Sequence, residues 1–277
     1  MTITTRDQLI DALANNASRI ILDKASLASQ VAGTYSSMWR ATGTPGQGAI
    51  PAAAAICTKA LTGAIGFTNQ TAPAESLIAW LWAVCSNSAQ TLEIHDRIAH
   101  MGGLNLTLLT AQTVGVDIQT LGVASDRIGS AGFDDLQWWY EVYTAGGATA
   151  SNATFNVTFD DNSTANLGTT LSVGGTLAAS RIFSIDALKS TAQQARKIRG
   201  VNSVTLSAST GTAGSAGVTV TRPRTVLPLA LANFAATADW AQVGLPDVPN
   251  DACLFPIMLN STTSTGTVRG GGKIAHG

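Results

Sequence analysis

The sequence predicts a mainly β protein: an antiparallel β-sandwich or jelly-roll-like body, preceded by an amphipathic helix and an arm rich in glycine and proline. Three observations lead to this class. Runs of alternating apolar and polar residues, rich in β-branched and aromatic side chains, recur from residue 76 onwards. Turn residues separate these runs, whereas the first 30 residues show a helical period. Antiparallel strands with regular turns favour two packed sheets, whose inward residues fill the space between them.

The first segment has the features of a helix that begins near residue 6. Thr5 followed by Gln8 is a capping-box pattern. Apolar residues then recur at helical spacing, at Leu9, Ile10, Leu13, Ala17, Ile20 and Ile21. We expect a helix from about residue 6 to 30, with charged residues on its other face. Such a helix needs a larger body or a partner chain to cover its apolar face.

Glycine and proline interrupt regular structure in the stretch "MWRATGTPGQGAIP", residues 38–51, which predicts an extended arm or a long loop. We therefore divide the chain into an N-terminal region of helix and arm, residues 1–75, and a β-sandwich body, residues 76–277. An extended arm can reach across a subunit boundary. We expect assembly contacts in this arm, at Trp39, Arg40, Pro45 and Ile50.

Strand-like runs fill most of the body, at 76–104, 135–145, 153–173, 201–209, 216–222 and 253–270. In the third run Phe155, Val157 and Phe159 alternate with polar neighbours, and "DDNS" at 160–163 then turns the chain. This pattern predicts a hairpin. Residues 184–198 are the exception, and we expect a short helix there.

The stretch "VNSVTLSASTGTAGSAGVTVTRPR", residues 201–224, raises the question of a phosphate site because Gly211, Gly214 and Gly217 are evenly spaced. A P-loop needs a lysine and a following helix, but this loop has no lysine and a strand-like run follows it. The G-x-G-x-x-G pattern of a dinucleotide site is absent too. Two alternating runs flank the loop, so we predict a β-hairpin with glycines in permissive turns.

The composition argues against nucleic-acid and membrane partners. Only 12% of the residues are charged, the net charge is -1 and there is no basic run of the kind that binds phosphates. The most apolar stretch, residues 76–86, is far shorter than the roughly 20 residues that span a bilayer. The N-terminus lacks the pattern of a secretory signal. Few surface charges weaken the usual barrier to association, which favours a protein that assembles.

No group of residues has the spacing of a catalytic or metal site. His95, Asp96 and His100 do not converge on one ion in either a strand or a helix, so we expect them to be structural. Catalysis by a serine would need one of the few histidines by chance, and there is no nucleophile-elbow motif. The three cysteines, Cys57, Cys85 and Cys253, are expected to be buried free thiols. We therefore expect no enzyme activity, no metal and no cofactor.

Aromatic residues are the remaining candidates for a binding surface. In "QWWYEVY" a strand would place Trp138 and Tyr140 on one face and Trp139 on the other. One face must be core; the other is either core as well or a platform for a sugar or a neighbouring subunit. We include Trp139 among the predicted assembly contacts. Trp80 and Trp82, in the most apolar run, are expected in the core.

Several stretches together resemble a family of tailed-bacteriophage virion structural proteins. The stretches are "MWRATGTPGQGAIP" (38–51), "EIHDRIAHMGGL" (93–104), "WWYEVYTAGGATA" (138–150), "VNSVTLSASTGTAGSAGVTVTR" (201–222) and "PNDACLFPIMLNSTTSTGTV" (249–268). The resemblance spans most of the chain after residue 35. It implies a non-enzymatic component of the virion, made in the host cytoplasm. It carries over no catalytic residue.

The predicted architecture is similar to that of capsid decoration, or cement, proteins. We therefore expect a protein that binds the major capsid protein and also copies of itself, most plausibly as a homotrimer around a symmetry axis. A tail or neck component, forming a ring or tube, is an alternative. A carbohydrate-binding module with Trp138 or Trp139 at a groove is a second alternative.

Overall fold

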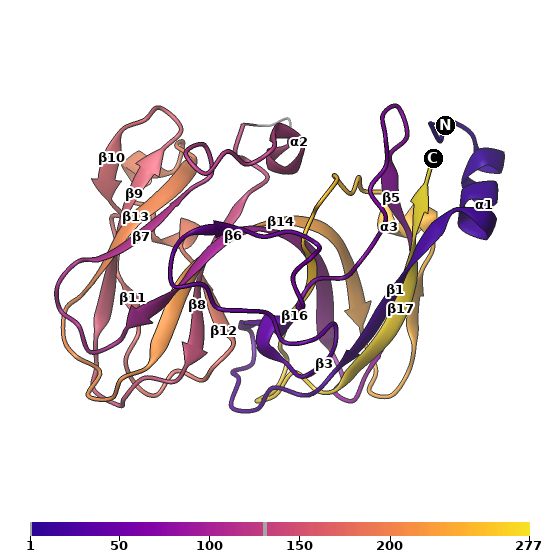
Figure 1. Ribbon diagram of the computed structural model, residues 1–277. Coiled ribbons are helices and arrows are strands. Elements are labelled where there is room, and N and C mark those ends of the chain that lie inside the picture. Colours follow the sequence, from indigo (N-terminus) through magenta and orange to yellow (C-terminus); the bar gives the residue numbers. More distant parts are fainter. Residues whose placement is uncertain (1, 130–131) are drawn as a thin grey trace. The chain divides into compact units, whose positions relative to one another are not determined.

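The computed structural model describes residues 2–129 and 132–277, and these residues form a mainly β protein with antiparallel sheets, as predicted (Figure 1). The chain folds as two compact units. The first comprises Met1–Ala49, Thr58–Asp96 and Pro223–Gly277, and the second comprises Ile50–Cys57 and Arg97–Arg222. The first 75 residues therefore do not form a unit of their own. Two long strands, β6 (Gln90–Asn105) and β14 (Ser215–Leu229), contribute residues to both units.

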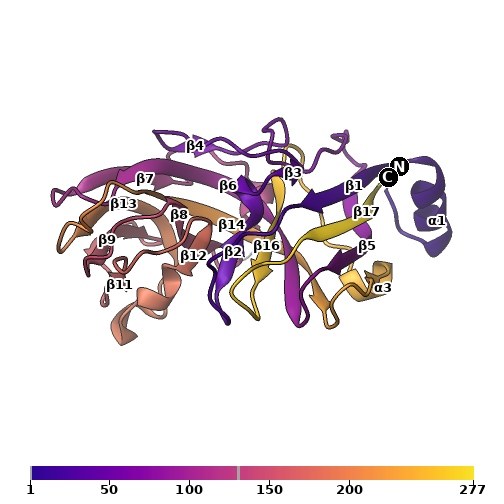
Figure 2. The ribbon, with the colours of Figure 1, turned by 90° about the horizontal axis from the view of Figure 1, so that it is seen from below.

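A five-stranded antiparallel sheet organises the first unit, in the order β15, β5, β17, β1, β3. Its strands are β1 (Ala17–Lys24), β3 (Gly43–Thr44), β5 (Ser76–Cys85), β15 (Ala236–Ala238) and β17 (Val268–His276). Figures 1 and 2 show β1, β17 and β5 side by side, with helix α1 (Arg6–Asn15) at one end of this group. The remaining elements of the unit are β2 (Tyr35–Ser37), the 3-10 turn η1 (Met38–Arg40), α3 (Trp240–Val243), β16 (Leu254–Leu259) and the first part of β6.

The core of the first unit follows from the alternation of its strands. Ile20 and Leu22 of β1, and Leu81 and Ala83 of β5, are buried on the same face of the sheet. They pack in one cluster with apolar residues of β6 and β16, among them Leu92, Ile94, Leu254 and Met258. Strand β16 pairs with both β2 and β6, which holds these residues in register.

The second unit is built around a sheet in the order β10, β9, β13, β7, with β11 also paired to β9. Its elements are β4 (Ala55–Ile56), β7 (Gln112–Asp117), α2 (Ser125–Ile128), β8 (Gln137–Thr144), β9 (Asn152–Phe159), β10 (Thr164–Asn166), β11 (Leu171–Ser172), β12 (Arg181–Ser184), η2 (Asp186–Leu188), η3 (Thr191–Gln193) and β13 (Ile198–Leu206). Strand β8 pairs with β12 and with the first part of β14. Phe155, Val157 and Phe159 of β9 enter the core, where Phe155 packs edge-on against Tyr140 at 5.7 Å between ring centroids.

The expected helix over residues 6–30 is wrong beyond Asn15. The capping box of Thr5 and Gln8 starts α1 as predicted. Residues 17–24 form β1 instead, paired along their length with β17. The apolar residues of this segment fit both a helical and a strand period, and the strand wins because Ile20, Leu22 and Lys24 then all point into the fold.

The predicted hairpin around Gly211 is also wrong, although both of its strands exist. Strand β13 pairs with β9 and β7, whereas β14 pairs with β8, so the loop connects strands of different sheets. The loop is too long for turn geometry to force its two flanking strands together. The other predicted hairpin is confirmed, since β9 and β10 pair on either side of residues 160–163. Residues 184–198 contain only the short turns η2 and η3 in place of a helix.

The glycine- and proline-rich stretch is tied to the first unit by a buried lysine. The ammonium of Lys24, on β1, donates hydrogen bonds to the backbone oxygens of Pro45 at 2.7 Å, Ala41 at 3.0 Å and Gly46 at 3.3 Å. Lys24 is 1% exposed, and burial lowers its pKa to about 8. This part of the expected arm is therefore folded against the sheet.

Candidate assembly surface

The predicted contact residues of the arm lie mostly inside the fold. Trp39 is fully buried, donates from its Nε1 to the backbone oxygen of Ala49 at 2.8 Å, and packs edge-on against Phe255. Pro45 is buried, while Arg40 and Ile50 are half-buried. A role of these residues in assembly stays a prediction.

The tryptophans of β8 do not form an exposed platform. Trp138 and Trp139 are 1% and 5% exposed, and their indole nitrogens donate to the backbone oxygen of Ile198 at 2.8 Å and to Oγ1 of Thr221 at 2.9 Å. Both faces of this strand are therefore core. A glycan site or an assembly contact at Trp139 would need this packing to open.

Two buried charges of the second unit, Arg97 and Glu141, pair with each other. Arg97 donates to Oε2 of Glu141 at 2.7 Å and to the hydroxyls of Tyr143 and Thr219, both at 2.9 Å, and His100 accepts from the same guanidinium. Burial by itself lowers the pKa of Arg97, but the charge of Glu141 beside it raises the pKa overall. The cluster is closed to solvent, so removal of one partner would leave the charge of the other buried without compensation.

The remaining polar candidates are buried with partners as well. His95 lies 2.8 Å from the carboxylate of Glu93, and Asp96 accepts a hydrogen bond from the backbone N–H of Cys253 at 2.8 Å. Cys57, Cys85 and Cys253 are buried free thiols, as predicted. Within residues 2–129 and 132–277 no group of His, Cys, Asp or Glu could hold a metal ion, and no helix is long and apolar enough to cross a membrane.

The outer face of the five-stranded sheet, in contrast, leaves large apolar side chains uncovered. The pairing of β1, β17 and β5 arranges the outward residues in three rows: Arg19, Lys273 and Trp80; Ile21, Gly271 and Trp82; Asp23, Arg269 and Val84. Ile21 is 57% exposed and Trp80 is 37% exposed, while Trp82 and Val84 are half-buried. We call Ile21, Trp80, Trp82, Val84 and Gly271 the tryptophan face.

Gly271 lies between Ile21 and Trp82 in the middle row of this face. A Cβ at this position would lie 3.0 Å from Nε1 of Trp82 and 3.1 Å from the backbone oxygen of Ile20. The glycine therefore leaves room for the Trp82 indole over the middle strand. Trp80 is oriented by a hydrogen bond from its Nε1 to Oγ1 of Thr237, at 3.2 Å. The result is two indoles held on one side of a sheet, next to solvent.

Helix α1 covers only one end of the same outer face. Leu9 and Ala12 of the helix pack on Ala79 of β5 and Ala275 of β17. Lys273 donates to the backbone oxygen of Leu13 at 2.6 Å, which neutralises part of the negative end of the helix. Trp80 shares its row with Lys273, whereas Trp82 and Val84 belong to the next two rows.

Charged side chains of β1 and β17 border the tryptophan face. Asp23 and Arg269 form an exposed ion pair at 3.2 Å, and Arg19 and Lys273 add two further cations. Exposed pairs of this kind contribute little stability, roughly 0 to 1 kcal/mol. Their effect is on orientation, since a partner must match a polar border around an apolar centre.

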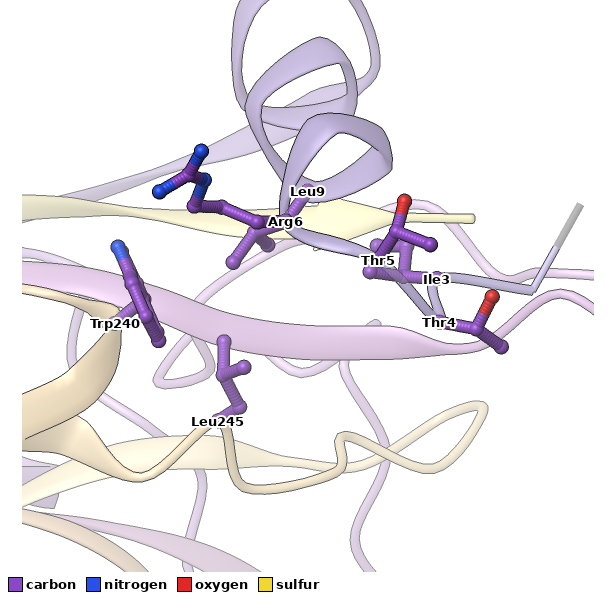
Figure 3. Close-up of a pocket in the computed structure, with 7 residues that line it drawn as sticks. All are labelled: Ile3, Thr4, Thr5, Arg6, Leu9, Trp240 and Leu245. Carbon is purple, nitrogen blue, oxygen red and sulfur yellow. The ribbon is translucent and has the colours of Figure 1, made fainter.

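A groove of about 230 Å³ adjoins α1 and is lined by Ile3, Thr4, Thr5, Arg6, Leu9, Trp240 and Leu245. Figure 3 shows Arg6 and Leu9 on one side of it and Trp240 and Leu245 on the other. Trp240, the first residue of α3, is 41% exposed. Asp239 caps this short helix by accepting from the backbone N–H groups of Ala241 and Gln242, which fixes where Trp240 points.

Sequence reasoning missed this surface because both faces of β5 are apolar. Leu81, Ala83 and Cys85 alternate with Trp80, Trp82 and Val84, so the run "SLIAWLWAVC" reads as buried on both sides. The expectation that Trp80 lies in the core is wrong. The run of three glycines in β17, residues 270–272, was the available signal, since a strand without side chains leaves its neighbours uncovered.

The fold and this surface together define a mainly β protein with an open aromatic face. No family model matches the sequence, and no curated protein matches it. Solved structures of particles of infectious bursal disease virus do match. The VP2 subviral particle is 9% identical over 94% of this chain and 79% of that chain, with a TM-score of 0.16. The T=1 particles derived from the virus are 10% identical over 94% and 77%, with a TM-score of 0.16. The Gx strain structure is 10% identical over 97% and 84%, with a TM-score of 0.14. At these TM-scores the likeness carries no argument about this chain.

Proposed function

We propose that this chain is a structural subunit of a virion and that the tryptophan face is the surface through which it binds the rest of the particle. In the finer form of the proposal it is a capsid decoration protein, which binds the major capsid protein as a homo-oligomer, most plausibly a trimer. It acts without catalysis, without a cofactor and without binding nucleic acid or a membrane.

The observation that carries this proposal is the exposure of Ile21 and Trp80, beside the half-buried Trp82, on one face of the sheet. Tryptophan is enriched at the centres of protein interfaces, and an apolar patch with a polar border marks an interaction site. The low charge of the chain and its resemblance to phage virion proteins support the same role. The buried polar groups described above have partners within the fold and offer no competing site.

The test is to label purified virions with antibody against this chain and to image them by electron microscopy. Label scattered over the head is the expected result and would make the capsid lattice the partner. Label confined to the neck or tail would leave a virion role but replace decoration by a ring or tube component. Virions without label would contradict the proposal.

Glycan binding is the second candidate, because one specific observation favours it. Trp80 and Trp82 lie two residues apart on the same strand face, so two indoles are available for stacking on sugar rings. The assay is a glycan array with the wild type, with Trp82→Ala, and with Leu108→Ala as a control that removes an exposed apolar residue elsewhere. Binding that only Trp82→Ala abolishes would favour this function over assembly.

A further inference from the structure

The loop between β14 and β15 exposes two large apolar side chains, Leu231 at 60% and Phe234 at 66%, which are the highest values among the large apolar residues of the described part of the chain. This loop is held in place. The backbone N–H of Ala89 donates to the oxygen of Ala230 at 3.1 Å, and that of Asn233 donates to the oxygen of Cys85 at 2.7 Å. The backbone of the loop is therefore fixed, and it presents two neighbouring apolar side chains that a partner could cover.

The groove beside α1 lies at the other end of the same short strand. The exposed loop precedes β15, and Trp240 follows it, so loop and groove belong to opposite ends of an edge strand. The groove measures about 230 Å³. Pockets for drug-sized ligands measure roughly 300–1,000 Å³. This groove is thus better matched to one or two protein side chains than to a small molecule.

We propose that the groove of one copy receives Leu231 and Phe234 of a second copy. This inference rests on the proposed function, a subunit that assembles, and names the partner of one of its surfaces. Because the loop and the groove are different parts of the chain, the contact is head-to-tail. Repetition of such a contact closes a ring when the rotation allows it.

The charges on the loop and on the groove are compatible with a second copy of the chain as the occupant. The segment from residue 225 to 238 carries no charged side chain. Arg6 is the one charged residue among those that line the groove in the described chain, and it is exposed. An uncharged loop can enter without bringing a second cation against Arg6. An acidic peptide or an anionic lipid would instead place its charge on Arg6, and is the rival occupant.

The area of the contact sets how strongly two copies associate. An aromatic side chain buries roughly 150–250 Å², so 66% of Phe234 corresponds to about 130 Å². Phe234 and Leu231 therefore supply only a small part of the approximately 1,200 Å² that a stable interface buries. Free copies should therefore associate weakly, and the contact should become stable where a ring or a particle surface holds neighbours together.

The test uses cysteine pairs, because the native cysteines are buried. We expect that mixing Ala235→Cys, beside Phe234, with Thr4→Cys, at the groove, gives disulfide-linked dimers under mild oxidation at high protein concentration, and that the double variant gives a ladder of larger species. The matched control mixes Ala235→Cys with Ile10→Cys, since Ile10 is 57% exposed on α1 but outside the groove. Cross-linking that is absent, or equal in the control, would overturn the inference.

A second measurement separates this inference from the proposed function. Wild type and Phe234→Ser are each mixed with virions depleted of the chain, and the co-sedimenting fraction is measured. We expect the serine variant to bind at least about tenfold more weakly, because adjacent copies on the particle no longer bind one another through the loop and the groove. Equal binding of both proteins would overturn the head-to-tail contact and leave the virion role intact. If the wild type itself does not bind, the proposed function fails first. Cross-link formation that is inhibited by an acidic peptide or by anionic vesicles present during the oxidation, but not by a peptide of residues 229–236, would overturn the inference in favour of the rival occupants.

Discussion

Replacing Trp80 by serine should weaken binding to the particle without unfolding the protein. Trp80 is 37% exposed on the tryptophan face. Of the roughly 250 Å² of a tryptophan side chain, about 90 Å² is therefore free to be covered by a partner. At about 25 cal/mol per Å², covering it contributes about 2.3 kcal/mol, which corresponds to roughly 40-fold in the dissociation constant. A symmetric oligomer would magnify this loss through its repeated contacts.

The assay is co-sedimentation of the purified variant with virions that lack the chain, over a series of protein concentrations. Leu108→Ser is the matched control, because Leu108 is 46% exposed in the second unit and lies outside the tryptophan face. Trp80→Ser should also lower stability, because the roughly 160 Å² of the indole that is buried in the fold and the bond to Thr237 are both lost. Binding is therefore compared at a temperature at which circular dichroism shows wild type and both variants to be folded. Wild-type binding by Trp80→Ser, or equal losses in both variants, would refute the assignment of this face.

Three further predictions concern stability. Burial, together with the charge of Lys59, lowers the pKa of His276, so the contribution of this residue to stability is complete above pH 6.5 and falls as the pH drops below that value. Denaturation at neutral and mildly acidic pH should therefore show a free energy of unfolding that decreases with falling pH, and His276→Gln should reduce this decrease. An unchanged pH dependence in the variant would contradict the prediction. Burial lowers the pKa of Lys24 from 10.5 to about 8. Relative to Lys24→Met, the free energy of unfolding of the wild type should therefore rise by up to about 3 kcal/mol as the pH increases between these two values. Urea titrations at several pH values measure this difference, and the same difference at every pH would contradict the prediction. Glu141→Gln should lower the free energy of unfolding by about 3–5 kcal/mol, because it leaves Arg97 buried without its counter-charge. Arg269→Ser, at the exposed ion pair with Asp23, should lower it by less than about 1 kcal/mol. Similar losses in the two variants would show that burial of the ion pair does not decide the effect.

The fold class was predictable because most of its signals are local. The capping box at Thr5 and the turn at residues 160–163 act over a few residues, and both features form as expected. What failed depends on distant partners. Residues 17–24 became a strand because β17, from the other end of the chain, pairs with them. The loop around Gly211 connects two sheets because β13, before it, pairs with β9, and β14, after it, pairs with β8.

The sequence predicted that the protein has an assembly surface, but it did not predict which residues form that surface. The low charge of the chain indicates an assembling protein, but it does not tell which tryptophans face solvent. Trp39 and Trp139 are buried by strands and loops that pack on them from distant parts of the chain. Trp80 is exposed because β17 offers only Gly271 and polar residues beside it. Exposure is thus a property of the neighbouring strand, which a single run of sequence does not contain.

The most direct test of the virion role is oxidative footprinting of the tryptophans, read out by mass spectrometry on the free chain and on intact virions. We predict that Trp80 and Trp82 are oxidised in the free chain and protected several-fold in virions, while the buried Trp39 and Trp138 stay unreactive in both. Equal oxidation of Trp80 and Trp82 in the two samples, or virions that do not contain the chain, would contradict the assignment of the tryptophan face as the assembly surface.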